Sequence, residues 1–104
     1  MTLILVYVTN PSLAVARRIT KHLLSKKLIA CANLFPSPIY SMYTWKGKLK
    51  QGKEWLAILK TSSSKFEAVK KEIEKIHPYE VPCIVKIPTS ANKAFEKWVA
   101  ESVL

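Results

Sequence analysis

The stretch Pro38–Thr61, PIYSMYTWKGKLKQGKEWLAILKT, decides the fold of this chain. It predicts two long strands that fold back on each other across a lysine-rich turn, because side chains alternate between two faces on both sides of that turn. Tyr40 and Met42 occupy one face of the first strand. Tyr43 and Trp45 occupy the other, so neither face is polar. We therefore expect both faces to be covered, and a partner chain is the simplest cover for so small a protein.

Glycines and prolines give this hairpin its expected shape. A turn could lie at Gly47 or at Gly52; we favour Gly47 for the turn and Gly52 for a bulge. Pro36 and Pro38 each lack a strand donor, which predicts a kink or bulge near Pro36. Fully extended, residues 29–45 would span roughly 55 Å at about 3.3 Å each, whereas a domain of this size has a radius of gyration of about 13 Å. The strand must bend or project past its own subunit.

Outside the hairpin the chain alternates strands and helices. The predicted segments are, in order, a buried strand at Leu3–Val8, a helix from Asn10-Pro11-Ser12 to about Lys27, a helix from Ser62-Ser63-Ser64 to His77, an edge strand at Val81–Ile87 and a helix from about Ala91 to Val103. Ser64 and Glu67 have capping-box spacing.

This order, strand, helix, long hairpin, helix and strand, is the βαββαβ order of an α+β ferredoxin-like plait, here with an extra C-terminal helix. We predict one domain over residues 1–104. In the strands, apolar residues occur at both odd and even positions, so they point to both faces of the sheet. The sheet face opposite the helices is therefore expected to be buried by oligomerisation.

The composition is that of a folded protein with a strong positive charge. Hydrophobic residues make up 49% of the chain and charged residues 23%. Seventeen Lys and Arg against seven acidic residues, all of them Glu, give a net charge of +10. Such a charge attracts anionic partners in general, but lysines spread over the chain also serve solubility. The only arginines are Arg17 and Arg18, which weighs against a nucleic-acid partner.

The cysteines and the first strand indicate the cellular compartment of the protein. Cys31 and Cys83 are too few and too far apart for a disulfide-stapled secreted module, so free thiols in a reducing compartment are expected. The apolar run at residues 3–8 lacks the basic region and cleavage site of a signal peptide. No stretch approaches the roughly 18 apolar residues of a membrane span. We predict a cytoplasmic protein without membrane insertion.

No catalytic motif is present, and the fold alone does not define an activity. The chain lacks GxSxG, HExxH, CxxC and a glycine-rich phosphate loop. Thr9-Asn10-Pro11-Ser12 has no glycine for an acyl phosphatase anion loop, and Lys53–Ala57 does not match the aromatic pattern of an RNA recognition motif. Cys31, Cys83 and His77 are the metal candidates, since copper and zinc favour thiolate and imidazole. Buried thiols and a helix C-terminal histidine are the structural alternatives.

The sequence resembles the divalent-ion tolerance (CutA) family over essentially the whole chain. The motifs that carry the resemblance are Ala30-Cys31-Ala32-Asn33, Tyr43-x-Trp45-x-Gly47-Lys48, Glu54, Ile58-Leu59-Lys60-Thr61 and His77-Pro78-Tyr79-Glu80-Val81-Pro82. The resemblance implies a nonenzymatic homotrimer in which hairpins pair between subunits. The family is linked to tolerance of copper and other divalent cations, and its animal members to acetylcholinesterase anchoring.

The resemblance also implies a site. It places the motif residues near one another in clefts between subunits, with Cys31, His77 and Glu80 as metal ligands, copper above all, and Trp45, Lys60 and Tyr79 as cleft residues. Some bacterial members carry cysteine and histidine where this chain has Val8 and Ile76, which puts metal binding through that set in doubt. The family turn is commonly acidic, whereas here four lysines make it basic.

Three functions remain open from the sequence. The leading one is a homotrimer that binds a divalent cation between subunits. The alternative is a small-molecule sensor that resembles the nitrogen-regulatory PII signalling trimers and holds an anion or nucleotide, as the basic turn and Lys60 suggest. The third is a scaffold for another protein.

Overall fold

One antiparallel sheet with helices on one of its faces forms the body of the molecule. The computed structural model describes all residues from Met1 to Leu104. The elements are β1 (Leu3–Asn10), α1 (Leu13–Ser25), β2 (Cys31–Leu34), β3 (Ile39–Trp45), β4 (Lys48–Ser62), the 3₁₀ turn η1 (Ser63–Lys65), α2 (Phe66–Ile76), β5 (Ile84–Thr89) and α3 (Lys93–Ser102). The strand order is β2-β4-β1-β5, and β3 pairs with the far part of β4. This is the predicted ferredoxin-like arrangement with an extra C-terminal helix.

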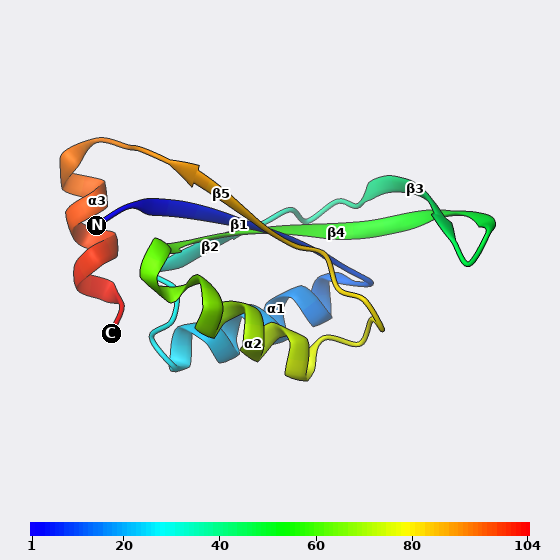
Figure 1. Cartoon of the computed structure of the whole chain (residues 1–104), viewed down its shortest axis with the longest axis horizontal. Coiled ribbons are helices and arrows are strands. Elements are labelled where there is room, and N and C mark those ends of the chain that lie inside the picture. Colours follow the sequence, from blue (N-terminus) through cyan, green and yellow to red (C-terminus); the bar gives the residue numbers. More distant parts are fainter.

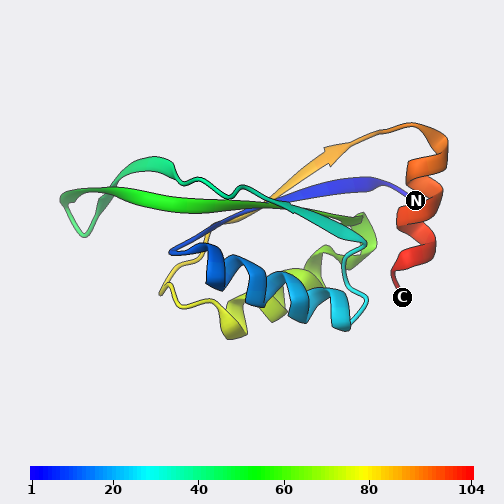
Figure 2. The same ribbon diagram turned by 180° about the vertical axis from the view of Figure 1, so that it is seen from behind.

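The helices α1 and α2 lie together against one face of the sheet (Figures 1 and 2). Of the two residues that could cap this helix, Asn10 and Ser12, Ser12 does so: its hydroxyl accepts a hydrogen bond from the Val15 backbone N–H at 3.1 Å. At the other end Lys27 adopts a left-handed conformation, with φ of 56°. Its N–H donates to the Leu24 carbonyl, and the Leu28 N–H donates to the Leu23 carbonyl. These two bonds are those of a Schellman motif, which closes the helix.

The start of α2 differs from its prediction. Ser62, not Ser64, acts as the cap: its hydroxyl oxygen accepts a bond from the Ser64 N–H, and η1 precedes the helix. Lys65 then stands at the N-terminus of α2 without a side-chain cap bond. The helix ends at Ile76 as expected, because Pro78 disfavours helical geometry at His77, whose ψ is 135°.

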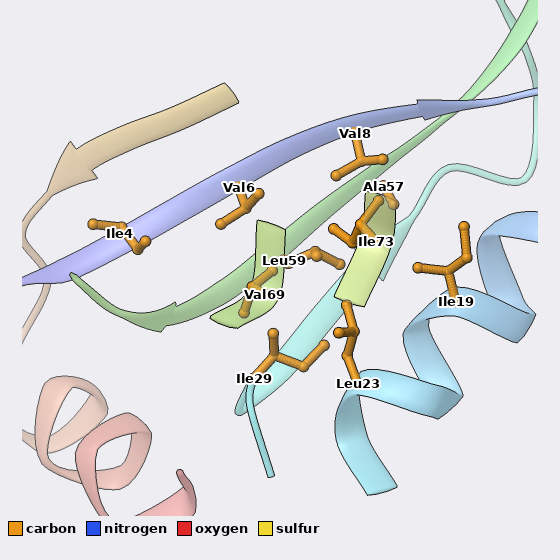
Figure 3. Packing of buried hydrophobic residues seen from close by; sticks show 10 residues of the cluster. All are labelled: Ile4, Val6, Val8, Ile19, Leu23, Ile29, Ala57, Leu59, Val69 and Ile73. Carbon is orange, nitrogen blue, oxygen red and sulfur yellow. The ribbon is translucent and has the colours of Figure 1, made fainter. Parts of the chain in front are cut away.

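The core lies between the sheet and these two helices (Figure 3). Ten buried apolar side chains form it: Ile4, Val6, Val8, Ile19, Leu23, Ile29, Ala57, Leu59, Val69 and Ile73. Every second residue of β1 contributes, and α1 and α2 contribute residues three or four positions apart. The alternate residues of these strands face away from this core.

The hairpin of β3 and β4 projects beyond the rest of the sheet (Figure 1). Lys46 and Gly47 both have positive φ, 50° and 78°, so the tight turn lies at Gly47 as predicted. The predicted bulge at Gly52 is wrong, because Gly52 pairs in unbroken register with Ser41. β1 ends where Asn10 pairs with Trp55, and β4 beyond that point has β3 as its only partner. The molecule is therefore elongated, with extents of 45 × 24 × 24 Å.

The kink predicted near Pro36 is present. Leu34 pairs with Ala57 and Ile39 pairs with Glu54, so residues 35–38 stand opposite only two residues of β4. The surplus residues separate β2 from β3 and offset the hairpin from the sheet.

The sheet face away from α1 and α2 remains largely uncovered within one chain. β5 is an edge strand, as predicted, and its Val85 and Ile87 are exposed on this face beside Tyr7 and Leu5 of β1. The strand begins at Ile84, three residues later than predicted, because Val81–Cys83 belong to the loop that arrives from α2. α3 packs at one end of the sheet near the N-terminus (Figure 2), where Val99 is fully buried.

Candidate functional site

A cleft of about 570 Å³ lies where the hairpin leaves the sheet. The hairpin contributes Tyr43, Trp45, Lys50 and Glu54 to it, and the loop after α2 contributes Pro78, Tyr79, Glu80, Val81 and Cys83. The hairpin residues share one face, since Tyr43 pairs with Lys50 and Glu54 follows Lys50 at an even spacing. The walls thus combine aromatic rings with both signs of charge.

Tyr79 ties the loop to the hairpin. Its hydroxyl donates a hydrogen bond of 2.9 Å to the Glu54 carboxylate. Burial, together with this bond to an anion, raises the pKa of the Tyr79 phenol well above its usual value. The phenol therefore stays protonated at neutral pH and keeps donating. This contact fixes the mouth of the cleft.

His77 lies behind Tyr79, and both of its ring nitrogens are engaged within the chain. Nδ1 accepts a hydrogen bond from the Tyr79 backbone N–H at 3.1 Å. Nε2 must then carry the proton, and it donates to the Thr9 carbonyl at 3.0 Å. The residue is 8% exposed, and burial lowers the pKa of its imidazole. In this arrangement His77 presents no free lone pair to a metal.

The lowered pKa of His77 makes stability depend on pH. Above about pH 6.5, the ordinary pKa of histidine, the imidazole is neutral in both the folded and the unfolded chain. As the pH falls below this value the unfolded chain binds a proton first, so the free energy of unfolding should decrease by at most about 1.4 kcal/mol per pH unit. Urea denaturation between pH 7.5 and 5 measures this slope. In His77→Gln the slope should be smaller, and an equal slope in both proteins would contradict the assignment.

Glu80 and Trp45 lie at the rim, under the basic hairpin tip. The Glu80 side chain is 71% exposed, and its carboxylate is 3.9 Å from the Lys46 ammonium. The same ammonium lies 5.7 Å from the centre of the Trp45 ring. Both contacts are exposed and weak, so Glu80 remains available to a ligand.

Cys31 and Lys60 lie elsewhere in the chain. They pair with each other across β2 and β4, and the Lys60 ammonium lies 5.5 Å from the Phe95 ring of α3. Lys60 lies six positions along β4 from Glu54, which is about 20 Å of strand. Burial raises the pKa of the Cys31 thiol, and nearby Lys60 opposes that shift.

One chain therefore brings only part of the predicted site together. Trp45, Tyr79 and Glu80 line the cleft and His77 supports it, whereas Cys31 and Lys60 do not reach it. No group of three or more His, Cys or Glu side chains that could hold a metal ion forms within the chain. Whether the two sets of residues meet between subunits stays a prediction.

Three hairpin residues of the cleft were not among the predicted site residues: Tyr43, Lys50 and Glu54. Cys83, a metal candidate from the sequence, also lines the cleft. The alternation of β3 and β4 contained a signal for the first three, because they share the face of Trp45. No sequence spacing could have indicated the contact of Glu54 with Tyr79, which lies 25 residues further along the chain. No helix in the structure is long and apolar enough to cross a membrane.

The fold and the cleft together define a class of protein. The chain has an α+β ferredoxin-like fold with an overlong hairpin and an aromatic, charged cleft at its base. Residues 4–102 match the family model described as CutA1 divalent ion tolerance protein. The chain belongs to this family.

Individual relatives support the assignment over nearly the whole length. The chain is 46% identical over 99 residues to the divalent-cation tolerance protein CutA of Archaeoglobus fulgidus, covering 94% of this chain and 95% of the relative. It is 44% identical over 103 residues to the protein of the same name from Thermotoga maritima, covering 98% and 100%. Neither name describes an enzymatic activity.

Solved structures agree with the sequence comparison. The crystal structure of CutA1 from Oryza sativa superposes with a TM-score of 0.94 at 33% identity, covering all of this chain and 95% of that one. The structure of the A. fulgidus protein, which is described as periplasmic, gives 0.93 at 44% identity and covers 98% and 99%. The overlong hairpin is therefore part of a fold shared with solved CutA structures.

Proposed function

We propose that this chain acts without catalysis in divalent-metal tolerance, as a homotrimer that binds copper in clefts between its subunits. The observation that carries the proposal is the uncovered apolar surface of the single chain. Large apolar side chains are exposed on the hairpin and on the open sheet face: Tyr40, Met42, Tyr43, Leu49, Val85 and Ile87. The exposure of several large apolar side chains on one hairpin and one sheet face is typical of surfaces that other subunits cover.

Assembly also supports the metal site, because the predicted ligands are separated within one chain. The Cys31 thiol lies on the open sheet face, where a neighbouring subunit would pack, and Glu80 lies exposed at the cleft rim. Cys31 of one subunit and Glu80 of the next would supply the thiolate and carboxylate of a copper site. His77 joins such a set only by giving up its bond from Tyr79 or its bond to Thr9.

Isothermal titration of the protein with Cu(II), and with Cu(I) under reducing conditions, tests this ligand set. Cys31→Ser should weaken binding by at least about tenfold, the loss typical for a disturbed metal shell. Cys83→Ser is the comparison variant, because Cys83 is equally half-buried and lines the cleft; weaker copper binding in this variant alone would make Cys83 the thiol ligand in place of Cys31. Unchanged binding in Cys31→Ser would remove Cys31 from the site.

His77 needs its own titration. If it becomes a ligand on assembly, His77→Ala should weaken copper binding by at least about tenfold. Circular dichroism at the titration temperature checks that the variant is folded. Unchanged affinity in a folded variant leaves His77 with its structural role only.

A second function is favoured by the chemistry of the cleft itself. Lys50 stands among the rings of Tyr43, Trp45 and Tyr79, and a cation beside aromatic rings suits a planar anion such as a nucleotide. This supports the alternative of a PII-like sensor. A thermal-shift screen of nucleotides and metabolites should then show stabilisation at millimolar concentration, because a ligand that binds the folded state raises its stability. No stabilisation by any of them would count against this function.

The compartment belongs to the same proposal. Cys31 and Cys83 are both unpaired, and thiols of this kind persist in a reducing cytoplasm. Fractionation of cells that express the untagged chain tests the cytoplasmic location.

A further inference from the structure

A groove of about 690 Å³ lies on the outer side of the helix layer, away from the hairpin. It runs from the C-terminal end of α1 along α2 and reaches the C-terminal residue. Figure 2 shows the end of α1 and the C-terminus at the same end of the molecule. Four lysines line it: Lys26, Lys27, Lys71 and Lys75. Glu72 is the one acidic side chain among the lining residues. The groove is thus rich in positive charge.

The charge of Glu72 is already compensated inside the layer. Its Oε1 lies 2.9 Å from His22 Nε2 and 3.1 Å from the Lys26 ammonium, and its Oε2 lies 3.0 Å from the Lys75 ammonium. Hydrogen bonds from His22, Lys75 and Lys26 lower the pKa of this carboxyl to about 2. Glu72 therefore anchors Lys26 and Lys75. Lys71 interacts electrostatically with the exposed Glu67 carboxylate, which does not line the groove.

Lys27 provides an independent observation. Its φ of 56° places it in the left-handed region at the position after the α1 cap, where glycine is the favoured residue. Two backbone bonds hold it there: its own N–H donates to Leu24, and its carbonyl accepts from the Leu104 N–H at 3.1 Å. Glycine would suit this backbone conformation better, so the turn itself does not require a lysine here. Here the side chain is an exposed ammonium that lines the groove.

We propose that this groove binds an anion with two or more linked phosphate groups, through Lys27 and Lys71 with Lys26 and Lys75 beside them. Lysine acts toward phosphate as a mobile point charge, which suits a wide polar groove better than a closed pocket. The groove lies on the opposite side of the sheet from Val85 and Ile87, so it stays accessible when the open sheet face is covered. The site is separate from the cleft and independent of copper binding.

Isothermal titration with inorganic tripolyphosphate at low ionic strength tests the proposal. Lys71→Ala and Lys27→Gly should each weaken binding by about tenfold, the usual contribution of one hydrogen bond to a charged group. Lys27→Gly should also keep or raise the melting temperature, because it relieves the backbone strain. Lys93→Ala, which removes an exposed lysine of α3 that forms no ion pair, should bind as the parent does.

The source of the phosphate groups is distinguished by a second probe. Phosphatidylcholine vesicles that contain phosphatidylinositol 4,5-bisphosphate are tested by co-sedimentation with the same variants. If Lys27→Gly and Lys71→Ala lose vesicle binding, the groove binds a lipid headgroup. If they lose tripolyphosphate binding alone, the groove binds a free anion. Either result supports the proposed anion site. Equal weakening by all three substitutions would reduce the effect to the net charge and overturn the proposal. No binding of either probe would overturn it as well.

Discussion

Replacing Leu59 by alanine is expected to lower the free energy of unfolding by about 3 kcal/mol. Leu59 is 1% exposed and lies on β4, which pairs with β1 on one side and β2 on the other. Its side chain points into the core between the sheet and the two helices (Figure 3). Truncation there removes buried apolar surface and leaves a cavity that well-packed neighbours cannot fill. Urea denaturation at fixed protomer concentration measures the loss.

Leu24→Ala is the matched control for this substitution. Leu24→Ala removes the same atoms, but Leu24 lies on α1 and is 40% exposed. Its effect should stay within about 0.5 kcal/mol. If Leu59→Ala cost no more than Leu24→Ala, the core would not lie where the structure places it.

Replacing Met42 by aspartate is expected to break the proposed trimer while each chain stays folded. Met42 is 63% exposed in the single chain and shares a hairpin face with Tyr40 and Leu49. If another subunit covers this face, an aspartate there becomes a buried carboxylate without a partner, which costs several kcal/mol. The association constant should fall by at least about 100-fold, or roughly 2.7 kcal/mol. Sedimentation velocity over a range of concentrations measures the change.

The control for the assembly experiment is Leu24→Asp. It introduces the same charge at an exposed leucine on the helix layer, outside the proposed interface. The oligomeric state should not change. If Met42→Asp assembled as strongly as Leu24→Asp, the hairpin face would not be the interface.

Much of the fold could be predicted because local patterns and the global arrangement agree. The continuous apolar run of β1 indicated a buried strand, and Ser12, Gly47 and Pro78 each marked a boundary that the structure keeps. Each of these residues acts through its own backbone geometry or hydrogen bond, so one sequence suffices to locate it.

The errors in the fold arose where several residues competed for one role. Three consecutive serines precede α2, and the first of them became the cap once a 3₁₀ turn took up the next residues. Gly52 suggested a bulge, but a glycine can also occupy a regular strand, and a β-carbon there would meet no atom within 4 Å. Such choices depend on tertiary packing, which the local sequence does not contain.

The candidate site was predicted less completely, for a geometric reason. Family motifs name the residues but do not say which of them meet within one chain. Trp45 and Tyr79 come together because the loop after α2 crosses to the hairpin base, whereas Cys31 is held at the other end of β4 by its pairing with Lys60. The internal bonds of His77 depend on the positions of Thr9 and Tyr79 in space. No spacing in the sequence encodes them.

The hairpin links the two parts of the proposed function. It extends past the end of β1, exposes apolar residues on both faces and forms one wall of the cleft. Assembly through the hairpin would cover those residues and bring the cleft of one chain to the open sheet face of another. The metal site is then a property of the trimer.

Native mass spectrometry with and without copper tests this central claim most directly, because one spectrum reports both assembly and bound metal. The account predicts a species of three times the chain mass of 11.8 kDa, which retains up to three copper ions after buffer exchange. Cys31→Ser should give the same trimer without copper. A monomer, or a wild-type trimer that retains no copper, would contradict the account.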